Sequence, residues 1–344
     1  MTLEAAIAII VTTTLLAYIG VARVRHHAWK RQLLDIPNER SSHQQPTPRG
    51  GGVMIVVLTL GGVLLLAPGT TRLAGYLAGG FIIALISGWD DIHPLTTRLR
   101  FATHGLVAAL VIGVVGYWHS ITLPLFGAVT LGWFGILVTW LWLVGLVNAY
   151  NFMDGIDGLA ATQAVFAGLG WSLLGWYVDE QMVTYLGLLV LSSSLGFLFH
   201  NWPPARIFMG DVGSAFLGYT FAVIPLFLPE STSLRADGLV LAVLLLWPFL
   251  FDTIFTFIHR WRQGEDVFAA HRSHLYQRLT IVGYSHRAVT MGYSVLMVTG
   301  IMLAWLWWRD IVIEAIPIIL LLLAATVWRV VVQLERTQTS RGIQ

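Results

Sequence analysis

Eleven long apolar stretches divide this 344-residue chain. A transmembrane helix needs roughly 20 consecutive apolar residues, and charged residues make up only 11% of the chain. We therefore predict an all-α fold, a polytopic integral membrane helix bundle with about eleven transmembrane helices. The expected spans are 3–22, 50–67, 72–89, 101–118, 123–147, 158–177, 182–199, 212–229, 238–258, 286–307 and 312–332.

The basic residues indicate which ends of these spans face the cytoplasm, because Lys and Arg collect in cytoplasmic loops. An external N-terminus places seventeen of the 20 Lys and Arg residues in the cytoplasm and leaves Arg72, Arg235 and Arg309 outside. An odd number of spans then makes the C-terminus cytoplasmic. Arg23 and Arg25 follow the first span instead of preceding it, so we expect a retained helix, not a cleaved signal peptide.

The chain is expected to form one membrane-embedded domain, 1–344, with its polar segments on the cytoplasmic side. The absence of cysteine excludes disulfides and thiol nucleophiles. A net charge of only +2 gives no reason to expect nucleic-acid binding. The loops expected to form the active site lie near 24–49, 90–100, 148–157, 200–211 and 259–285.

The segment NAYNFMDGIDGLA, 148–160, carries the most specific pattern. Asn148, Asn151, Asp154 and Asp157 recur every three residues, whereas an α-helix turns once in 3.6 residues. They can share one face only if the segment tightens or breaks, which its glycines would permit. The alternative is that Asp157 caps the next helix, which leaves the other three unexplained.

Further acids stand at span ends. Asp90 and Asp91 close the third span, and Asp211 precedes the eighth. Phe208 is a candidate for stacking on a flat base, or is simply buried at the membrane interface. Asp252 falls inside the ninth span, about 12 Å inward along a straight helix, and an intramembrane carboxylate is a candidate functional residue.

Two loops are basic. HRWRQGEDVFAAHRSHLYQRL, 259–279, contains His271, Arg272 and His274, and the first loop contains Arg49. Arginine suits bidentate recognition of phosphate. The alternative for the loop 259–279 is an ordinary positive-inside loop, and the alternative for the first loop is a flexible linker.

Carboxylate, amide and phosphate oxygens suit Mg²⁺, or alternatively Mn²⁺. Acids and arginines at a membrane surface indicate phosphoryl transfer between a soluble nucleotide and a lipid phosphate. The other class with many spans and buried acids is a cation- or proton-coupled transporter. No inverted repeat is visible here, and most of the acids lie at span ends.

The motifs GWDD, NAYNFMDGIDGLA and FMGDVGS, in this order, resemble the polyprenyl-phosphate N-acetylhexosamine-1-phosphate transferases of glycosyltransferase family 4. The resemblance implies transfer of sugar-1-phosphate from a UDP-N-acetylated sugar to undecaprenyl phosphate, with release of UMP. It implies a Mg²⁺ cofactor and an active site on the cytoplasmic face of the bacterial inner membrane. A homodimer is compatible with the resemblance.

The resemblance also implies roles for individual residues. Asp211 matches the magnesium ligand and Asn151 a second one, while Asp90, Asp91 and Asp154 join Asp211 as catalytic acids. It places Asn148, Asp157 and Phe208 at the uridine, and Arg272 and His274 near the diphosphate or sugar. Arg49 and His271 are further candidates for binding substrate because they stand in the two basic loops.

One loop departs from the family pattern. Relatives often read D-R-x-H-L-H-H-R-L where this chain reads HRSHLYQRL, with Tyr276 and Gln277 in place of two histidines. This form resembles the branch that initiates O-antigen synthesis and accepts 6-deoxy sugars such as N-acetylfucosamine or N-acetylquinovosamine.

Overall fold

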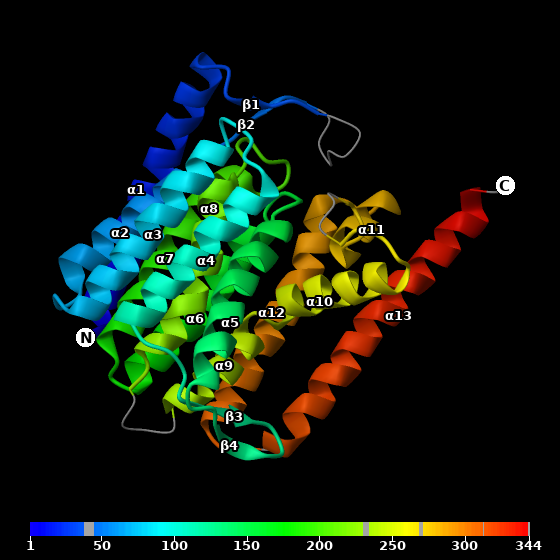
Figure 1. Cartoon of the computed structure of the whole chain (residues 1–344). Coiled ribbons are helices and arrows are strands. Elements are labelled where there is room, and N and C mark those ends of the chain that lie inside the picture. Colours follow the sequence, from blue (N-terminus) through cyan, green and yellow to red (C-terminus); the bar gives the residue numbers. More distant parts are fainter. Residues whose placement is uncertain (38–44, 230–233, 268–270, 312, 343–344) are drawn as a thin grey trace.

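Helices account for most of the computed structural model, which describes residues 1–37, 45–229, 234–267, 271–311 and 313–342 (Figure 1). The α-helices are α1 (Leu3–Lys30), α2 (Val53–Leu66), α3 (Thr71–Asp90), α4 (Thr97–Val114), α5 (Phe134–Phe152), α6 (Leu159–Tyr177), α7 (Gln181–Asn201), α8 (Asp211–Val223), α9 (Leu234–Leu245), α10 (Trp247–Arg262), α11 (Leu275–Ile281), α12 (His286–Trp308) and α13 (Ile316–Gly342). The other elements are the 3₁₀ helices η1 (Ile224–Phe227) and η2 (Ile313–Ala315), the antiparallel pair β1 (Leu34–Asp35) and β2 (Thr47–Pro48), and the hairpin β3 (Ser120–Leu123) and β4 (Gly127–Thr130).

The predicted polytopic helix bundle is confirmed. Seven helices in the described part of the chain are long and apolar enough to cross a membrane, or eight if α9 and α10 form one bent span. Each of the eleven expected segments contains a helix. However, α2 has 14 residues and α8 has 13, fewer than the roughly 20 that a full crossing needs. The count of eleven and the orientation stay predictions.

Two expected spans differ from the structure. The span expected at 123–147 begins later, because residues of the β3–β4 hairpin precede α5. The span expected at 238–258 is broken, because α9 and α10 meet at 76°. Pro248 lies in the first turn of α10, where its missing N–H is harmless but where a continuous helix would lose a hydrogen bond. Asp252 and Arg260 both lie within α10, so the depth expected for Asp252 stays a prediction.

Helix α7 packs against α1, α2 and α6 (Figure 1). A Cβ atom on Gly168 of α6 would lie 2.8 Å from the carbonyl oxygen of Gly187 on α7, and one on Gly187 would lie 2.5 Å from the backbone nitrogen of Ser172. The two backbones thus touch, which is the packing that small residues permit between membrane helices. This closely packed core supports the helix ends that carry the polar residues.

Two of the three arginines expected outside have a structural role. Arg72 and Arg235 both donate to the carbonyl oxygen of Leu226 in η1, and Arg72 also donates to that of Val115. Helix ends leave such carbonyls without intrahelical partners. These two exceptions to the positive-inside pattern therefore satisfy helix ends at the far end of α8 from Asp211.

Candidate active site

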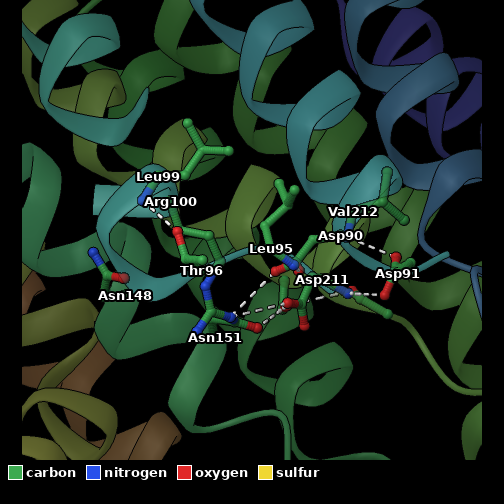
Figure 2. Close-up of polar contacts among 12 residues, drawn as sticks. Asp90, Asp91, Leu95, Thr96, Leu99, Arg100, Asn148, Asn151, Asp211 and Val212 are labelled. Atoms are coloured by element: carbon green, nitrogen blue, oxygen red, sulfur yellow. Dashed lines mark hydrogen bonds and ion pairs between the residues drawn. The ribbon is translucent and has the colours of Figure 1, made fainter. Parts of the chain in front are cut away.

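Two segments that are distant in sequence bring three acids together where α3 ends and α8 begins. Figure 2 shows Asp90, Asp91 and Asp211 close together, with Arg100 of α4 beside them. Asp91 and Asp211 are 120 residues apart in the chain and are joined by a hydrogen bond. Acids from the ends of two expected spans therefore lie side by side.

Asp91 holds the N-terminus of α8. Its Oδ1 accepts a hydrogen bond from the backbone N–H of Asp211 at 2.9 Å, and its Oδ2 accepts one from Val212 at 3.1 Å. Gly210, at φ +78°, precedes the helix, and a Cβ there would lie 2.6 Å from Oδ2 of Asp91. Burial raises the pKa of Asp91, although the two N–H donors and Arg49 oppose that shift. Asp91 therefore caps a helix from outside it.

Asp90 faces Arg100 instead. Its Oδ1 accepts from the backbone N–H of Leu95 at 2.6 Å, and its Oδ2 lies 3.2 Å from Nη1 of Arg100. The same Nη1 lies 3.6 Å from Oδ2 of Asp211. One guanidinium thus neutralises part of the charge of two carboxylates (Figure 2).

The two asparagines line the pocket beside these acids. Asn148 donates to Nδ1 of His104 at 3.1 Å and to the carbonyl oxygen of Val144 at 2.7 Å. Asn151 accepts from the hydroxyl of Ser214, on the first turn of α8, at 2.7 Å. The pocket is lined by Ile86, Ser87, Asp90, Thr97, Arg100, Phe101, His104, Asn148, Asn151, Phe152, Asp211 and Ala215.

The NAYNFMDGIDGLA segment breaks, as its spacing predicted. Helix α5 ends at Phe152, and Gly158, at φ +78°, precedes α6. A Cβ on Gly155 would lie 2.1 Å from the hydroxyl of Tyr276, so this glycine makes room for a residue of the distant loop. Burial, and then the charges of Asp211, Asp91 and Asp157, raise the pKa of Asp154 well above its usual range.

Asp157 does not cap α6, so the capping alternative is wrong. Its Oδ2 accepts from the backbone N–H of Ala205 at 3.0 Å and lies 3.3 Å from Nδ1 of His286. It does not line the pocket that holds Asn148. The shared uridine site predicted for these two residues stays a prediction.

The first loop is bound through its backbone to the segment that precedes α8. The N–H groups of Gly51 and Gly52 donate to the carbonyl oxygens of Phe208 and Met209. The half-buried Phe208 therefore lies beside the first loop. Arg49 lies 3.9 Å from the carboxylate of Asp91. Residues 38–44 and 268–270 of the expected loops lie outside the described residues.

The second basic loop is anchored on Asp252. This fully buried carboxylate accepts from Nδ1 of His274 at 3.1 Å, from the backbone N–H groups of Leu275 and Tyr276 at 2.8 and 3.2 Å, and from the hydroxyls of Tyr293 and Thr256 at 2.6 and 3.2 Å. The hydroxyl of Tyr276 donates to the carbonyl oxygen of Phe152. Asp252 thus ties this loop to α10, and Tyr276 ties the loop to the end of α5.

The three loop residues expected to bind substrate differ in exposure. His274 is buried against Asp252, whereas His271 and Arg272 are half-buried. Burial and the neighbouring His274 and Arg260 lower the pKa of His271 to about 4, so its imidazole is neutral at pH 7. Of these three residues, Arg272 alone brings a permanent positive charge.

Several pocket and contact residues were missed by sequence reasoning. Arg100 was read only as a positive-inside charge, and His104, Ser214 and His286 were not assigned. Their partners lie on other helices, so no local spacing marks them. Among the described residues, no group of three or more His, Cys, Asp and Glu side chains is arranged to hold a metal ion.

The sequence is similar to known transferases. The family model described as glycosyl transferase family 4 matches residues 73–228. A probable undecaprenyl-phosphate N-acetylglucosaminyl 1-phosphate transferase of Bacillus subtilis (strain 168) is 35% identical over 266 residues, 77% of this chain and 74% of the relative. A decaprenyl-phosphate N-acetylglucosaminephosphotransferase of Mycobacterium tuberculosis (strain H37Rv) is 30% identical over 81% of this chain and 77% of the relative. A phospho-N-acetylmuramoyl-pentapeptide-transferase of Latilactobacillus sakei is 38% identical over 37% of this chain and 40% of the relative.

Proposed function

This chain belongs to glycosyl transferase family 4, and we propose that it transfers sugar-1-phosphate from a UDP-N-acetylated sugar to undecaprenyl phosphate, with release of UMP. The names of the relatives support a polyprenyl-phosphate acceptor and a sugar-phosphate donor. The observation that carries the proposal is the position of Arg100 between Asp90 and Asp211 at the edge of one pocket. Carboxylates and a positioned guanidinium at such a site suit the binding of a diphosphate and the stabilisation of its charge.

The proposed reaction is a single displacement. A phosphate oxygen of the lipid attacks the phosphorus that carries the sugar, the bridging P–O bond breaks, and UMP leaves with the bridging oxygen. The second pKa of a phosphomonoester is about 6, so the nucleophile is largely dianionic at pH 7. A general base therefore adds little, and the chain contributes mainly by positioning and by stabilising charge. We assign the charge stabilisation to Arg100 and Arg272.

Mg²⁺ is the proposed cofactor, with Mn²⁺ as the alternative. The residues present fit it, because Asp90, Asn151 and Asp211 bring carboxylate and amide oxygens to one pocket. Asn151 accepts one hydrogen bond, from Ser214, and its oxygen has a second lone pair. Mg²⁺ is commonly held by one or two carboxylates with substrate phosphates, so a cage of three acidic side chains is not required. When bound, the ion would neutralise charge on the diphosphate.

The reaction is tested with purified protein, Mg²⁺, undecaprenyl phosphate and a panel of UDP-sugars. UMP and a lipid-linked sugar diphosphate are the expected products. Release of UDP would instead indicate ordinary glycosyl transfer and overturn the reaction type. Lack of any product with every sugar would overturn the proposal.

We further propose that this transfer initiates the synthesis of O-antigen or a related surface polysaccharide, with a UDP-linked 6-deoxy N-acetylated sugar as donor. The support is the HRSHLYQRL sequence, in which Tyr276 replaces a family histidine and lies against Gly155. The panel should therefore include UDP-N-acetylfucosamine and UDP-N-acetylquinovosamine beside UDP-N-acetylglucosamine, the sugar in the names of two relatives. Preference for UDP-N-acetylglucosamine would refute this assignment and leave the reaction type standing.

A further inference from the structure

The last helix, α13, lies at the edge of the bundle and packs against α11 (Figure 1). It is long and apolar enough to cross a membrane, yet only 11% of its most apolar stretch is buried in the protein. The ring of Trp328 lies 6.4 Å from that of Phe255 on α10, and Val331 is buried. Glu335 follows Val331 by four residues, so it lies on the same side of the helix. This side of α13 therefore faces the bundle.

Glu335 forms a bidentate ion pair with Arg278 of α11. Nε and Nη2 of Arg278 donate to the two carboxylate oxygens at 2.7 and 2.6 Å. The two side chains are only 20% and 28% exposed, so water screens this pair less than it screens a pair on an open surface. Two parallel charge-assisted bonds are stronger and more specific than one. Because Glu335 occupies one edge of the guanidinium, Arg278 is a poor candidate for binding a substrate phosphate.

Helix α11 depends on such contacts, because it has only seven residues. Isolated helices shorter than about 12–15 residues are marginal in water. The carboxylate of Asp252 holds the first turn of α11 by accepting from the N–H groups of Leu275 and Tyr276. The pair with Glu335 adds a second point of attachment beyond that turn. Two points of attachment fix the direction of the helix.

The segment that carries Arg272 leads directly into α11. Ser273 follows Arg272, and its hydroxyl accepts from Nη1 of Arg260 at 3.1 Å. His274 is buried and immediately precedes the helix. With so few residues between them, a change in the direction of α11 would move Arg272.

We propose that Arg278 and Glu335 are a positioning pair for the basic loop. The pair fixes α11, and α11 in turn fixes Arg272, to which we assign charge stabilisation at the diphosphate of the UDP-sugar. This inference rests on the proposed function. It makes the last membrane helix a support of the active site, although none of the described residues of α13 lines the pocket beside the acids.

Steady-state kinetics of the detergent-purified protein test the pair. Glu335→Gln and Arg278→Gln should each raise KM for the UDP-sugar about fivefold, because substrate binding must then restore the loop against a loss of about 1 kcal/mol. KM for undecaprenyl phosphate should not change. The double variant should resemble either single variant, since both residues act through one contact. Arg336→Gln is the matched control, because Arg336 is exposed on the same helix, and it should keep the KM of the parent.

Hydrogen exchange tests the anchoring of α11 without turnover. The backbone N–H groups of Leu275 and Tyr276 should exchange faster in each single variant than in the parent, because the helix opens more easily. Unchanged exchange would overturn the inference even if transfer occurs. Faster exchange in both single variants, but not in Arg336→Gln, would support the anchoring of the loop even if no UDP-sugar is used.

Three kinetic outcomes in an active enzyme would overturn the inference. The first is an unchanged KM for the UDP-sugar in both single variants. The second is an equal rise in Arg336→Gln, which would show a general effect of charge on α13. The third is a set of losses that add in the double variant, with Arg278→Gln far worse than Glu335→Gln, which would mean that Arg278 contacts the substrate itself.

Discussion

The carboxylate of Asp91 is joined to the backbone N–H of Asp211 by a 2.9 Å hydrogen bond. This contact separates the functions of two adjacent acids. Asp90 turns toward Arg100 and the pocket, while Asp91 turns toward the N-terminus of α8. A negative charge there is favourable, because the unpaired N–H groups and the helix dipole make a helix N-terminus positive. Asp91 therefore positions Asp211.

The first prediction concerns the stability that this contact provides. Asp91→Ala should lower the free energy of unfolding by about 0.5–2 kcal/mol, the usual range for losing a helix cap. Asp91→Asn should cost less, because its amide oxygen can still accept one of the two N–H bonds. Thermal denaturation of the detergent-purified variants measures the order. An alanine variant as stable as the parent would contradict the capping role.

The second prediction concerns Arg100, which bridges Asp90 and Asp211. Arg100→Gln should reduce kcat by about 100-fold or more, as is typical when a group that stabilises transition-state charge is removed. Arg98→Gln is the matched control, because Arg98 lies one half-turn away on α4 and is exposed. Steady-state assays of both variants measure kcat. Equal losses in the two would show a general effect of charge on α4 and contradict a specific role for Arg100.

The sequence was informative where local patterns decide structure. The apolar stretches predicted the helices, and the spacing from Asn148 to Asp157 predicted the break after α5. It was less informative where tertiary contacts decide. Asp90 and Asp91 look equivalent in the chain, yet they face different partners because α8 begins beside only one of them. The bend at Pro248 was also missed, since an apolar run of 238–258 fits one straight helix equally well.

The third prediction concerns the metal. EDTA should stop transfer and added Mg²⁺ should restore it, since oxygen ligands and phosphates suit this ion. Asp211→Asn should lower kcat roughly 100-fold or more, because loss of a charged ligand weakens the stabilisation that a metal supplies. Full activity in EDTA, or near-normal turnover by the folded Asp211→Asn variant, would refute the assignment.

The fourth prediction concerns the charge of His271. Its pKa is lowered to about 4, so the imidazole gains a proton only as the pH falls toward that value. Between about pH 5.5 and 8 it stays neutral. The ratio of kcat/KM between the parent and His271→Gln should therefore be constant across this range, even though other groups make each profile depend on pH. A ratio that changes near pH 6.5 would mean that His271 titrates normally.

The fifth prediction concerns Asp252, which anchors the loop that carries His271 and Arg272. Asp252→Asn removes the charge that five donors share, and an amide cannot accept from all of them. The loop should shift, and KM for the UDP-sugar should rise about tenfold or more, because Arg272 would lose a hydrogen bond to the diphosphate, which is worth about 1.5–3 kcal/mol. Thr256→Val removes only one of the five donors and is the matched control. Steady-state kinetics with varied UDP-sugar measure both variants. A rise in KM should occur in Asp252→Asn far more than in Thr256→Val, and an unchanged KM in a folded Asp252→Asn variant would show that the loop holds its position without this carboxylate.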